Sequence, residues 1–174
     1  MEHFYFSIIS ILFLLTIFAF LGMAKWYFTK EMSVIKKELI KQSQRDVLPI
    51  KIQAYERLVL FLERIAPESL ILREQGSTTT NMNLQRVLLS AIRNEYEHNQ
   101  AMQIYVSSET WDRVKLAKEE IVRVINMCST EVSPVNPSIE LAKIVIERFQ
   151  FSGISQLNRA LESLRSEVSD LSKI

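Results

Sequence analysis

The sequence contains very few of the residues from which catalytic and metal sites are usually built. It has one cysteine, Cys128, and two histidines, His3 and His98. A lone cysteine excludes an intrachain disulfide, and a structural zinc site needs about four Cys and His ligands. No glycine pattern typical of a nucleophile elbow surrounds any serine. The sequence therefore predicts no metal, no cofactor and no enzyme activity, with Cys128 as a small buried apolar residue.

Glycine and proline are also scarce, with 3 and 4 copies among 174 residues. The prolines fall where the helical pattern is interrupted, and no alternating apolar and polar run typical of a strand is present. These absences favour an all-α protein. We expect one N-terminal transmembrane helix followed by a cytoplasmic helical bundle of four or five helices.

Neither sign of charge is in clear excess. The chain has 21 basic and 20 acidic residues, and its formal net charge is +1. Nucleic-acid-binding domains usually gather a basic excess on one face, so the balance argues against a nucleic-acid partner. The local basic excess, at residues 25–45, follows the apolar beginning of the chain. Its expected partner is the anionic headgroups of a lipid bilayer.

The sequence contains one long apolar run, at residues 4–24, and no charged residue lies within it. At about 1.5 Å per residue, a helix of this length matches the roughly 30 Å hydrocarbon core of a bilayer. A cleaved signal peptide fits less well, because a basic start and a small-residue cleavage site are missing. A buried core helix fits less well, because it rarely carries such an uninterrupted apolar run, and an in-plane helix needs a polar face that the run lacks. The run predicts a transmembrane anchor.

Flanking residues predict how this anchor is placed. Aromatic residues border both ends of the run, and the membrane-interface residues at its carboxyl end are Lys25, Trp26, Tyr27 and Lys30. Because Lys and Arg accumulate only after the run, the positive-inside rule places the N-terminus outside. We therefore expect a single-pass membrane protein with its C-terminal domain in the cytoplasm.

Three segments follow from these patterns: an anchor at 4–24, a juxtamembrane basic helical stalk at 25–47 and an all-helical domain at 48–174. The stalk carries a narrow apolar stripe at helical spacing, formed by Phe28, Met32, Ile35 and Leu39. We interpret it as a solvated stalk, and a short parallel coiled coil that pairs two anchors is the alternative.

Within the domain, Pro49 predicts the first turn of a new helix, and Pro67 predicts its end at Ala66. Residues 68–75 fit either one more helical turn or a connector, and the polar run 76–81 predicts a loop. Ser107 or Ser108 is expected to cap a helix, and Asn136 to cap another with Pro137 at its first position. The expected later helices cover 83–106, 109–127, 138–151 and 154–174. Their predicted core residues include Leu84, Leu88, Ile92, Trp111, Val114, Ala117, Ile121, Ile125, Ile139, Ala142, Ile146 and Phe149.

The last of these segments has the most regular apolar pattern. Steps of three and four residues link Ile154, Leu157, Leu161, Leu164, Val168 and Leu171. Such a seam is typical of a helix that pairs with one partner helix. The partner is either a helix of the same molecule, which we favour, or a second copy or another protein.

One cluster of polar residues, at 94–99, is a candidate for a metal site or a polar contact. Glu95 and His98 lie three apart and share a helix face, as in half of a di-iron carboxylate site, which makes them weak metal-ligand candidates. A complete site needs this motif twice, and the chain has it once. The alternatives are an ordinary surface pair, or a polar knot in which Tyr96, Glu97 and His98 bond Arg57 or Arg64.

Four features together resemble a known family: the apolar N-terminal run, AYERLVLFLERI at 54–65, NEYEHNQAMQIYVS at 94–107, and Trp111 followed by Ala117 and Lys118. They are similar to a group of uncharacterised membrane-anchored proteins from Bacteroidetes, a domain of unknown function. The resemblance implies a bacterial inner-membrane setting. It implies no activity, ligand or catalytic residue.

Two functions remain. The first is an adaptor or scaffold whose helical domain makes protein–protein contacts, with another protein or a second copy of itself as partner. The second is a membrane-anchored enzyme or metal-binding bundle that uses Glu95 and His98. The balanced charge, the seam at 154–171 and the lack of catalytic constellations favour the first.

Overall fold

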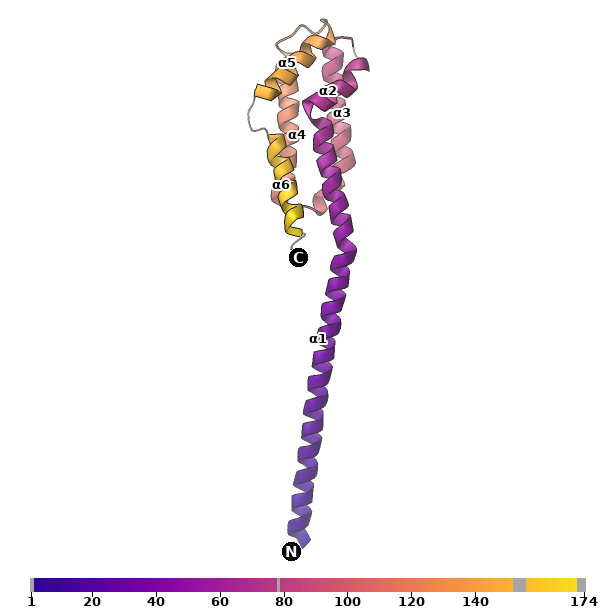
Figure 1. Ribbon diagram of the computed structural model, residues 1–174, viewed down its shortest axis with the longest axis vertical. Helices are drawn as coiled ribbons and strands as arrows, with labels where there is room; N and C mark the ends of the chain where they lie inside the picture. Colours follow the sequence, from indigo (N-terminus) through magenta and orange to yellow (C-terminus); the bar gives the residue numbers. More distant parts are fainter. Residues whose placement is uncertain (1, 78, 152–155, 172–174) are drawn as a thin grey trace. The chain divides into compact units, whose positions relative to one another are not determined.

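A computed structural model describes residues 2–77, 79–151 and 156–171, with side chains at these positions except 2–12, 14, 33–35, 37, 39–40, 43–44 and 77. Within them lie six α-helices, two short 3₁₀ helices and a single isolated β-bridge between Thr80 and Pro137 (Figure 1). The all-α prediction is therefore confirmed. The helices are α1 (Glu2–Ile65), α2 (Pro67–Glu74), η1 (Gln75–Ser77), α3 (Asn81–Asn99), η2 (Gln100–Ile104), α4 (Ser108–Ser129), α5 (Ser138–Phe151) and α6 (Gln156–Leu171).

The chain divides into two compact units, Met1–Leu48 and Pro49–Ile174. The predicted helix start at Pro49 is wrong, because α1 continues through this proline. A proline inside a helix removes one backbone hydrogen bond and costs about 3 kcal/mol. Many helix-forming residues lie on both sides of Pro49, and their hydrogen bonds continue the helix across it.

In the first unit the described apolar side chains point to solvent. The exposed fraction is 78% at Phe18 and 64% at Trp26. The hydroxyls of Thr16 and Thr29 each donate to a backbone carbonyl of the preceding turn, at 2.8 Å. The ammonium group of Lys30 lies 5.1 Å from the centre of the Trp26 ring, a cation–π contact.

The predicted membrane span at residues 4–24 is contradicted. In the part of the chain that the structure describes, no helix has the combination of length and apolar character needed to cross a membrane. The predicted single-pass inner-membrane location and orientation depended on that span and fall with it.

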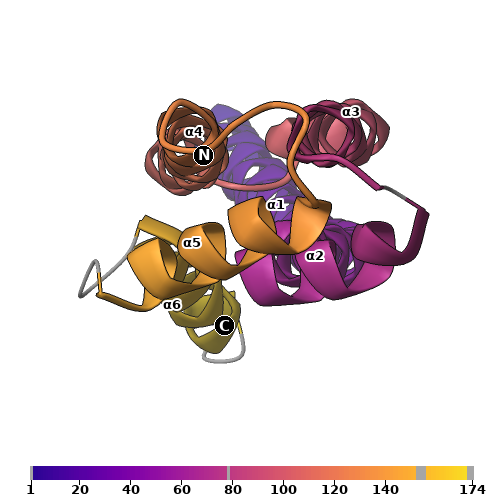
Figure 2. The same cartoon turned by 90° about the horizontal axis from the view of Figure 1, so that it is seen from above.

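In the second unit, residues 49–65 of α1, α3, α4 and α6 run alongside one another, and α2 and α5 lie across one end (Figures 1 and 2). The apolar faces of these helices form one continuous core. Its fully buried larger members are Leu58, Phe61, Leu62, Ile65, Leu70, Leu84, Leu88, Ile92, Ile121, Ile125, Leu141 and Leu164. Cys128 is buried in this core as predicted, and burial raises the pKa of its thiol.

The helix ends follow local capping. Helix α1 ends at Ile65, one residue before the predicted end, and Pro67 begins α2, so residues 68–74 are helical. Helix α3 ends at Asn99 and the chain continues as η2, so the α-helix is shorter than predicted. The Ser107 hydroxyl accepts from the Thr110 N–H at 3.1 Å, which confirms the predicted cap of α4.

The cap of α5 differs from the prediction. Helix α5 begins at Ser138, after Pro137, and the predicted cap Asn136 instead donates its side-chain amide to Glu140 at 3.0 Å. The buried Asn81 side chain accepts the Leu141 N–H at 3.2 Å and donates to the Ser133 carbonyl at 2.8 Å. A residue more than 50 positions away therefore satisfies the first turn of α5, which no local pattern predicts.

Candidate binding groove between α1 and α3

The first wall of the groove is the solvent face of α1. Helical spacing turns Leu58, Phe61 and Leu62 into the core, and it leaves Arg57, Leu60 and Arg64 on the opposite side. These three residues are three and four positions apart, so they form a stripe along one face. Leu60 is 57% exposed between the two arginines. This placement is unusual because the other leucines of this segment are fully buried.

The second wall is the last turns of α3. Leu84, Leu88 and Ile92 fix the rotation of α3 by packing into the core. This rotation brings Asn94, Glu95, His98 and Asn99 to face the stripe on α1. A cavity of about 420 Å³ lies between the two walls, and we call it the α1/α3 groove. Its lining residues are Arg57, Leu60, Phe61, Arg64, Asn94, Glu95, His98 and Asn99.

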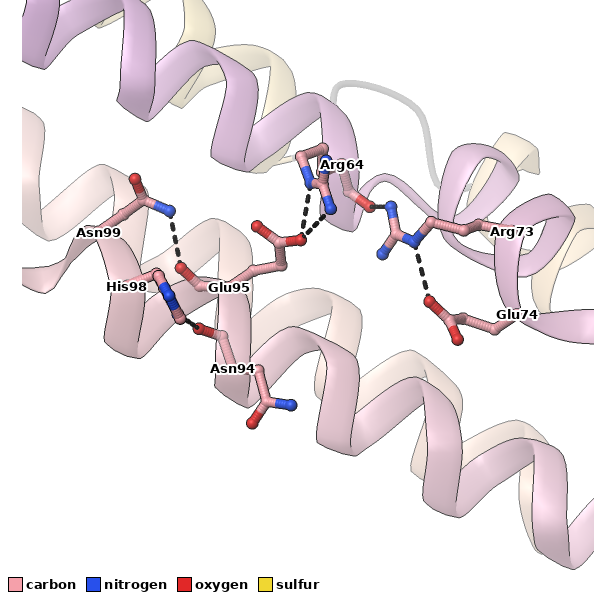
Figure 3. A network of polar contacts seen from close by, with 7 residues as sticks. All are labelled: Arg64, Arg73, Glu74, Asn94, Glu95, His98 and Asn99. Carbon is pink, nitrogen blue, oxygen red and sulfur yellow. Dashed lines mark hydrogen bonds and ion pairs between the residues drawn. The ribbon is translucent and has the colours of Figure 1, made fainter. Parts of the chain in front are cut away.

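An ion pair closes one end of the groove. The Arg64 Nε donates to Glu95 Oε1 at 2.6 Å (Figure 3). Arg73 of α2 donates to the Arg64 backbone carbonyl at 3.3 Å and pairs with Glu74 at 2.8 Å. In Figure 3 the Arg64 and Glu95 side chains extend toward each other from opposite walls. The pair therefore links α1 to α3 and neutralises both charges.

The middle of the groove is held by contacts to the backbone. Asn99 donates to the Glu95 carbonyl at 2.8 Å, and Arg57 donates to the His98 carbonyl at 3.2 Å. His98 Nδ1 lies 3.3 Å from the Asn94 carbonyl. A carbonyl only accepts, so Nδ1 is the donor in this contact.

Arg57 differs from the other arginines of this region. Arg64 and Arg73 each pair with a carboxylate, whereas the contact of Arg57 is to a backbone carbonyl. Among the described residues, no carboxylate forms an ion pair with Arg57. A guanidinium offers five N–H donors, so most of the hydrogen-bond donors of Arg57 face solvent.

The metal candidates Glu95 and His98 do lie in the groove, but Glu95 is engaged by Arg64. Among the side chains that the structure describes, no group of three or more His, Cys, Asp and Glu residues is close enough to hold a metal ion. The predicted knot of Tyr96, Glu97 and His98 with Arg57 or Arg64 is present only in part: Arg57 bonds the His98 backbone carbonyl, and Arg64 pairs with Glu95. Tyr96 instead stacks on Trp111, with ring centres 5.9 Å apart, and Lys118 lies over it at 4.3 Å.

The heptad seam packs inside the second unit. Leu157, Leu161 and Leu164 are buried, and Val168 and Leu171 are partly buried against the same core. Helix α6 packs against α4, and the two helices run alongside each other in Figure 1. Ile154 lies outside the described residues. The predicted interface residues Lys25, Trp26, Tyr27 and Lys30 belong to the first unit and are exposed.

A second polar cluster, formed by Tyr55, Ser107, Thr110, Ser163 and Glu167, joins α1, α4 and α6. We call it the Glu167 cluster. The Glu167 carboxylate accepts from the Tyr55 hydroxyl at 2.7 Å and from the Ser107 N–H at 3.3 Å. It also accepts from the Ser107 and Thr110 hydroxyls. Because the Thr110 hydroxyl donates its hydrogen bond to Glu167, the Ser163 hydroxyl is the donor to the Thr110 oxygen, at 2.7 Å.

These contacts decide the ionisation of Glu167. Burial by itself raises the pKa of this carboxyl, but the hydrogen bonds from Ser107, Thr110 and Tyr55 outweigh burial and hold the pKa below its ordinary value. Burial, and then the bond to Glu167, raises the pKa of Tyr55. Glu167 also lies at the amino end of α4, where the helix dipole favours a negative charge. The cluster is therefore an ionised carboxylate with its donors supplied by the fold.

The second unit is a helical bundle, and the groove on its surface is lined by both polar and apolar side chains. In the comparisons with known proteins, residues 2–171 match the model of a family described as a family of unknown function (DUF7935). The chain belongs to this family, which confirms the resemblance to an uncharacterised group. The description names no activity for the family. No curated protein and no solved structure matches the chain.

Proposed function

We propose that this protein is an interaction module, an adaptor or scaffold, whose α1/α3 groove receives a segment of a partner protein chain. The observation that carries the proposal is Leu60, which is 57% exposed between Arg57 and Arg64 and lines a cavity of about 420 Å³. Arginine is enriched at protein interfaces, and a partner that docks on the two arginines also covers the apolar side chain between them.

The electrostatics of the groove support a protein partner. Arg64 and Glu95 neutralise each other, so the lining carries both signs of charge with little excess. The whole chain has a formal net charge of +1. A nucleic acid requires a gathered basic surface, and this groove has one acidic residue among its few charges.

The proposal is tested by site-specific photo-crosslinking in the cells from which the chain derives. A photo-reactive residue replaces Leu60 in one variant and Leu116 in a matched control. Leu116 lies on α4 and is 49% exposed, so both probes meet solvent to a similar extent. We expect position 60 to yield a discrete protein adduct that position 116 does not yield. Equal labelling from both positions, or none from position 60, contradicts the proposal.

A further inference from the structure

We propose that the groove recognises an acidic partner segment in which an Asp or Glu side chain lies next to a large apolar side chain. The inference rests on the proposed function and names the chemistry of the partner. It starts from the charges of the groove. Because Arg64 is matched by Glu95, the remaining positive charge in the lining is that of Arg57.

Arg57 has the geometry to bind a carboxylate. Its guanidinium is exposed, and it uses one N–H group to hold the His98 carbonyl at 3.2 Å. The other N–H groups form a planar fork that matches the two oxygens of a carboxylate. The backbone contact fixes the guanidinium against α3. This fixation reduces the side-chain entropy that binding otherwise removes.

Leu60 adds the apolar half of the recognition. It lies one helical turn from Arg57, so the two side chains are neighbours on the surface of α1. The buried Phe61 lies beside Leu60 in the lining of the groove. An apolar partner side chain that covers Leu60 also removes water from Arg57. Loss of water strengthens the charge-assisted hydrogen bond between Arg57 and the partner carboxylate.

A carboxylate fits this groove better than a phosphate. A phosphate group carries a charge of about −1.5 to −2 and is usually bound by several cations. Here one unmatched guanidinium lies in a groove that also contains the Glu95 carboxylate and the apolar side chains of Leu60 and Phe61. A single negative charge balances Arg57, whereas a doubly charged group leaves one charge unbalanced near Glu95.

The test is a selection of displayed random peptides on the full-length protein, followed by titration of the enriched peptides. We expect enriched sequences to share Asp or Glu within one helical turn of Leu, Ile, Met or Phe. Arg57→Gln is expected to weaken binding about ten- to a hundredfold, because a hydrogen bond to a charged group is lost. Changing the peptide acid to its amide is expected to weaken binding equally, with no further loss on Arg57→Gln.

Matched variants identify the cause of any loss. Arg123→Gln removes the same charge from the exposed face of α4 and is expected to leave binding unchanged. Arg57→Lys keeps the charge without the fork and is expected to bind between wild type and Arg57→Gln. Leu60→Asp is expected to abolish binding, and Leu116→Asp is expected to preserve it. Circular dichroism confirms that each variant is folded.

The possible results separate the two proposals. Peptides that need Leu60 but ignore Arg57, or that carry a phosphate or a basic residue in place of the acid, overturn the acidic-segment inference and leave the interaction module standing. A dimer of this chain that Leu60→Asp dissociates assigns the groove to a second copy and also overturns the inference. Enriched peptides whose binding survives both Leu60→Asp and Arg57→Gln contradict both proposals.

Discussion

The Glu167 cluster and the α1/α3 groove both connect α1 to a neighbouring helix through charged side chains, but the fold completes only the first. The half-buried Glu167 carboxylate receives hydrogen bonds from Tyr55, Ser107 and Thr110, so the fold supplies its partners. In the groove, Arg57 is bonded to one backbone carbonyl and faces solvent. Polar groups that the fold satisfies stabilise the fold, and those that it leaves open remain available to a partner.

The largest effect is expected from removing the centre of the completed cluster. Glu167→Ala leaves the buried Tyr55 and Thr110 hydroxyls without their acceptor. Stranded buried donors cost about 1–3 kcal/mol each, so we expect a loss of about 3 kcal/mol in the free energy of unfolding. Urea unfolding of the full-length chain measures it. The control is Glu162→Ala on the exposed face of α6, which is expected to change the free energy by less than about 0.5 kcal/mol.

The second prediction uses pH to switch the same cluster. Because the folded-state pKa of Glu167 is lowered, its ionised form contributes stability above the unfolded pKa, which is about 4.3 for glutamate. This contribution is lost as the pH falls through the folded-state pKa. The difference in unfolding free energy between wild type and Glu167→Gln is therefore expected to be constant near neutral pH and to shrink below about pH 4. A difference that grows in acid contradicts the assignment.

A smaller effect is expected at the edge of the cluster. Tyr55→Phe removes one hydroxyl and keeps the buried ring, so the expected loss is about 1 kcal/mol. In a double-mutant cycle with Glu167→Ala, the two losses should not add, because both changes remove the same hydrogen bond. Additive losses indicate that the two residues stabilise the fold independently.

The smallest effect on stability is expected in the groove. Arg57→Gln and Leu60→Asp change exposed side chains and are expected to alter the free energy of unfolding by less than about 0.5 kcal/mol. Arg64→Gln breaks an exposed ion pair and is expected to cost up to about 1 kcal/mol. The same urea titrations measure these values. Losses in the groove as large as that of Glu167→Ala identify it as a structural element of the fold.

Most of the helical core could be predicted from the sequence because it depends on periodicity. Leu84, Leu88 and Ile92 of α3 and Val114, Ile121 and Ile125 of α4 are all buried as expected. Helix α5 shows the limit of this method. Ile139 was expected to face the core and is 60% exposed, whereas Leu141 and Val145 are buried. The apolar residues of this short helix fit two different faces. Which of the two faces is buried depends on where the neighbouring helices lie.

The groove could be predicted only in part. Spacing placed Glu95 and His98 on one face. The predicted polar knot joined Tyr96, Glu97 and His98 to Arg57 or Arg64, whereas the structure pairs Arg64 with Glu95 and bonds Arg57 to the His98 carbonyl. The exposure of Leu60 was not predicted, although its position between Arg57 and Arg64 on a charged face is a usable signal. Glu167 was not predicted either. It flanks an apolar seam like any solvent-facing residue, and its donors come from helices that are distant in sequence.

The central claim is that the fold leaves the α1/α3 groove open for a partner protein. The most direct test is photo-crosslinking from position 60 in cells, with position 116 as control and Arg57→Gln as a second background. The account predicts a discrete protein adduct from position 60 that is absent at position 116 and reduced by Arg57→Gln. An adduct pattern at position 60 that equals that at position 116 in the wild-type background contradicts it.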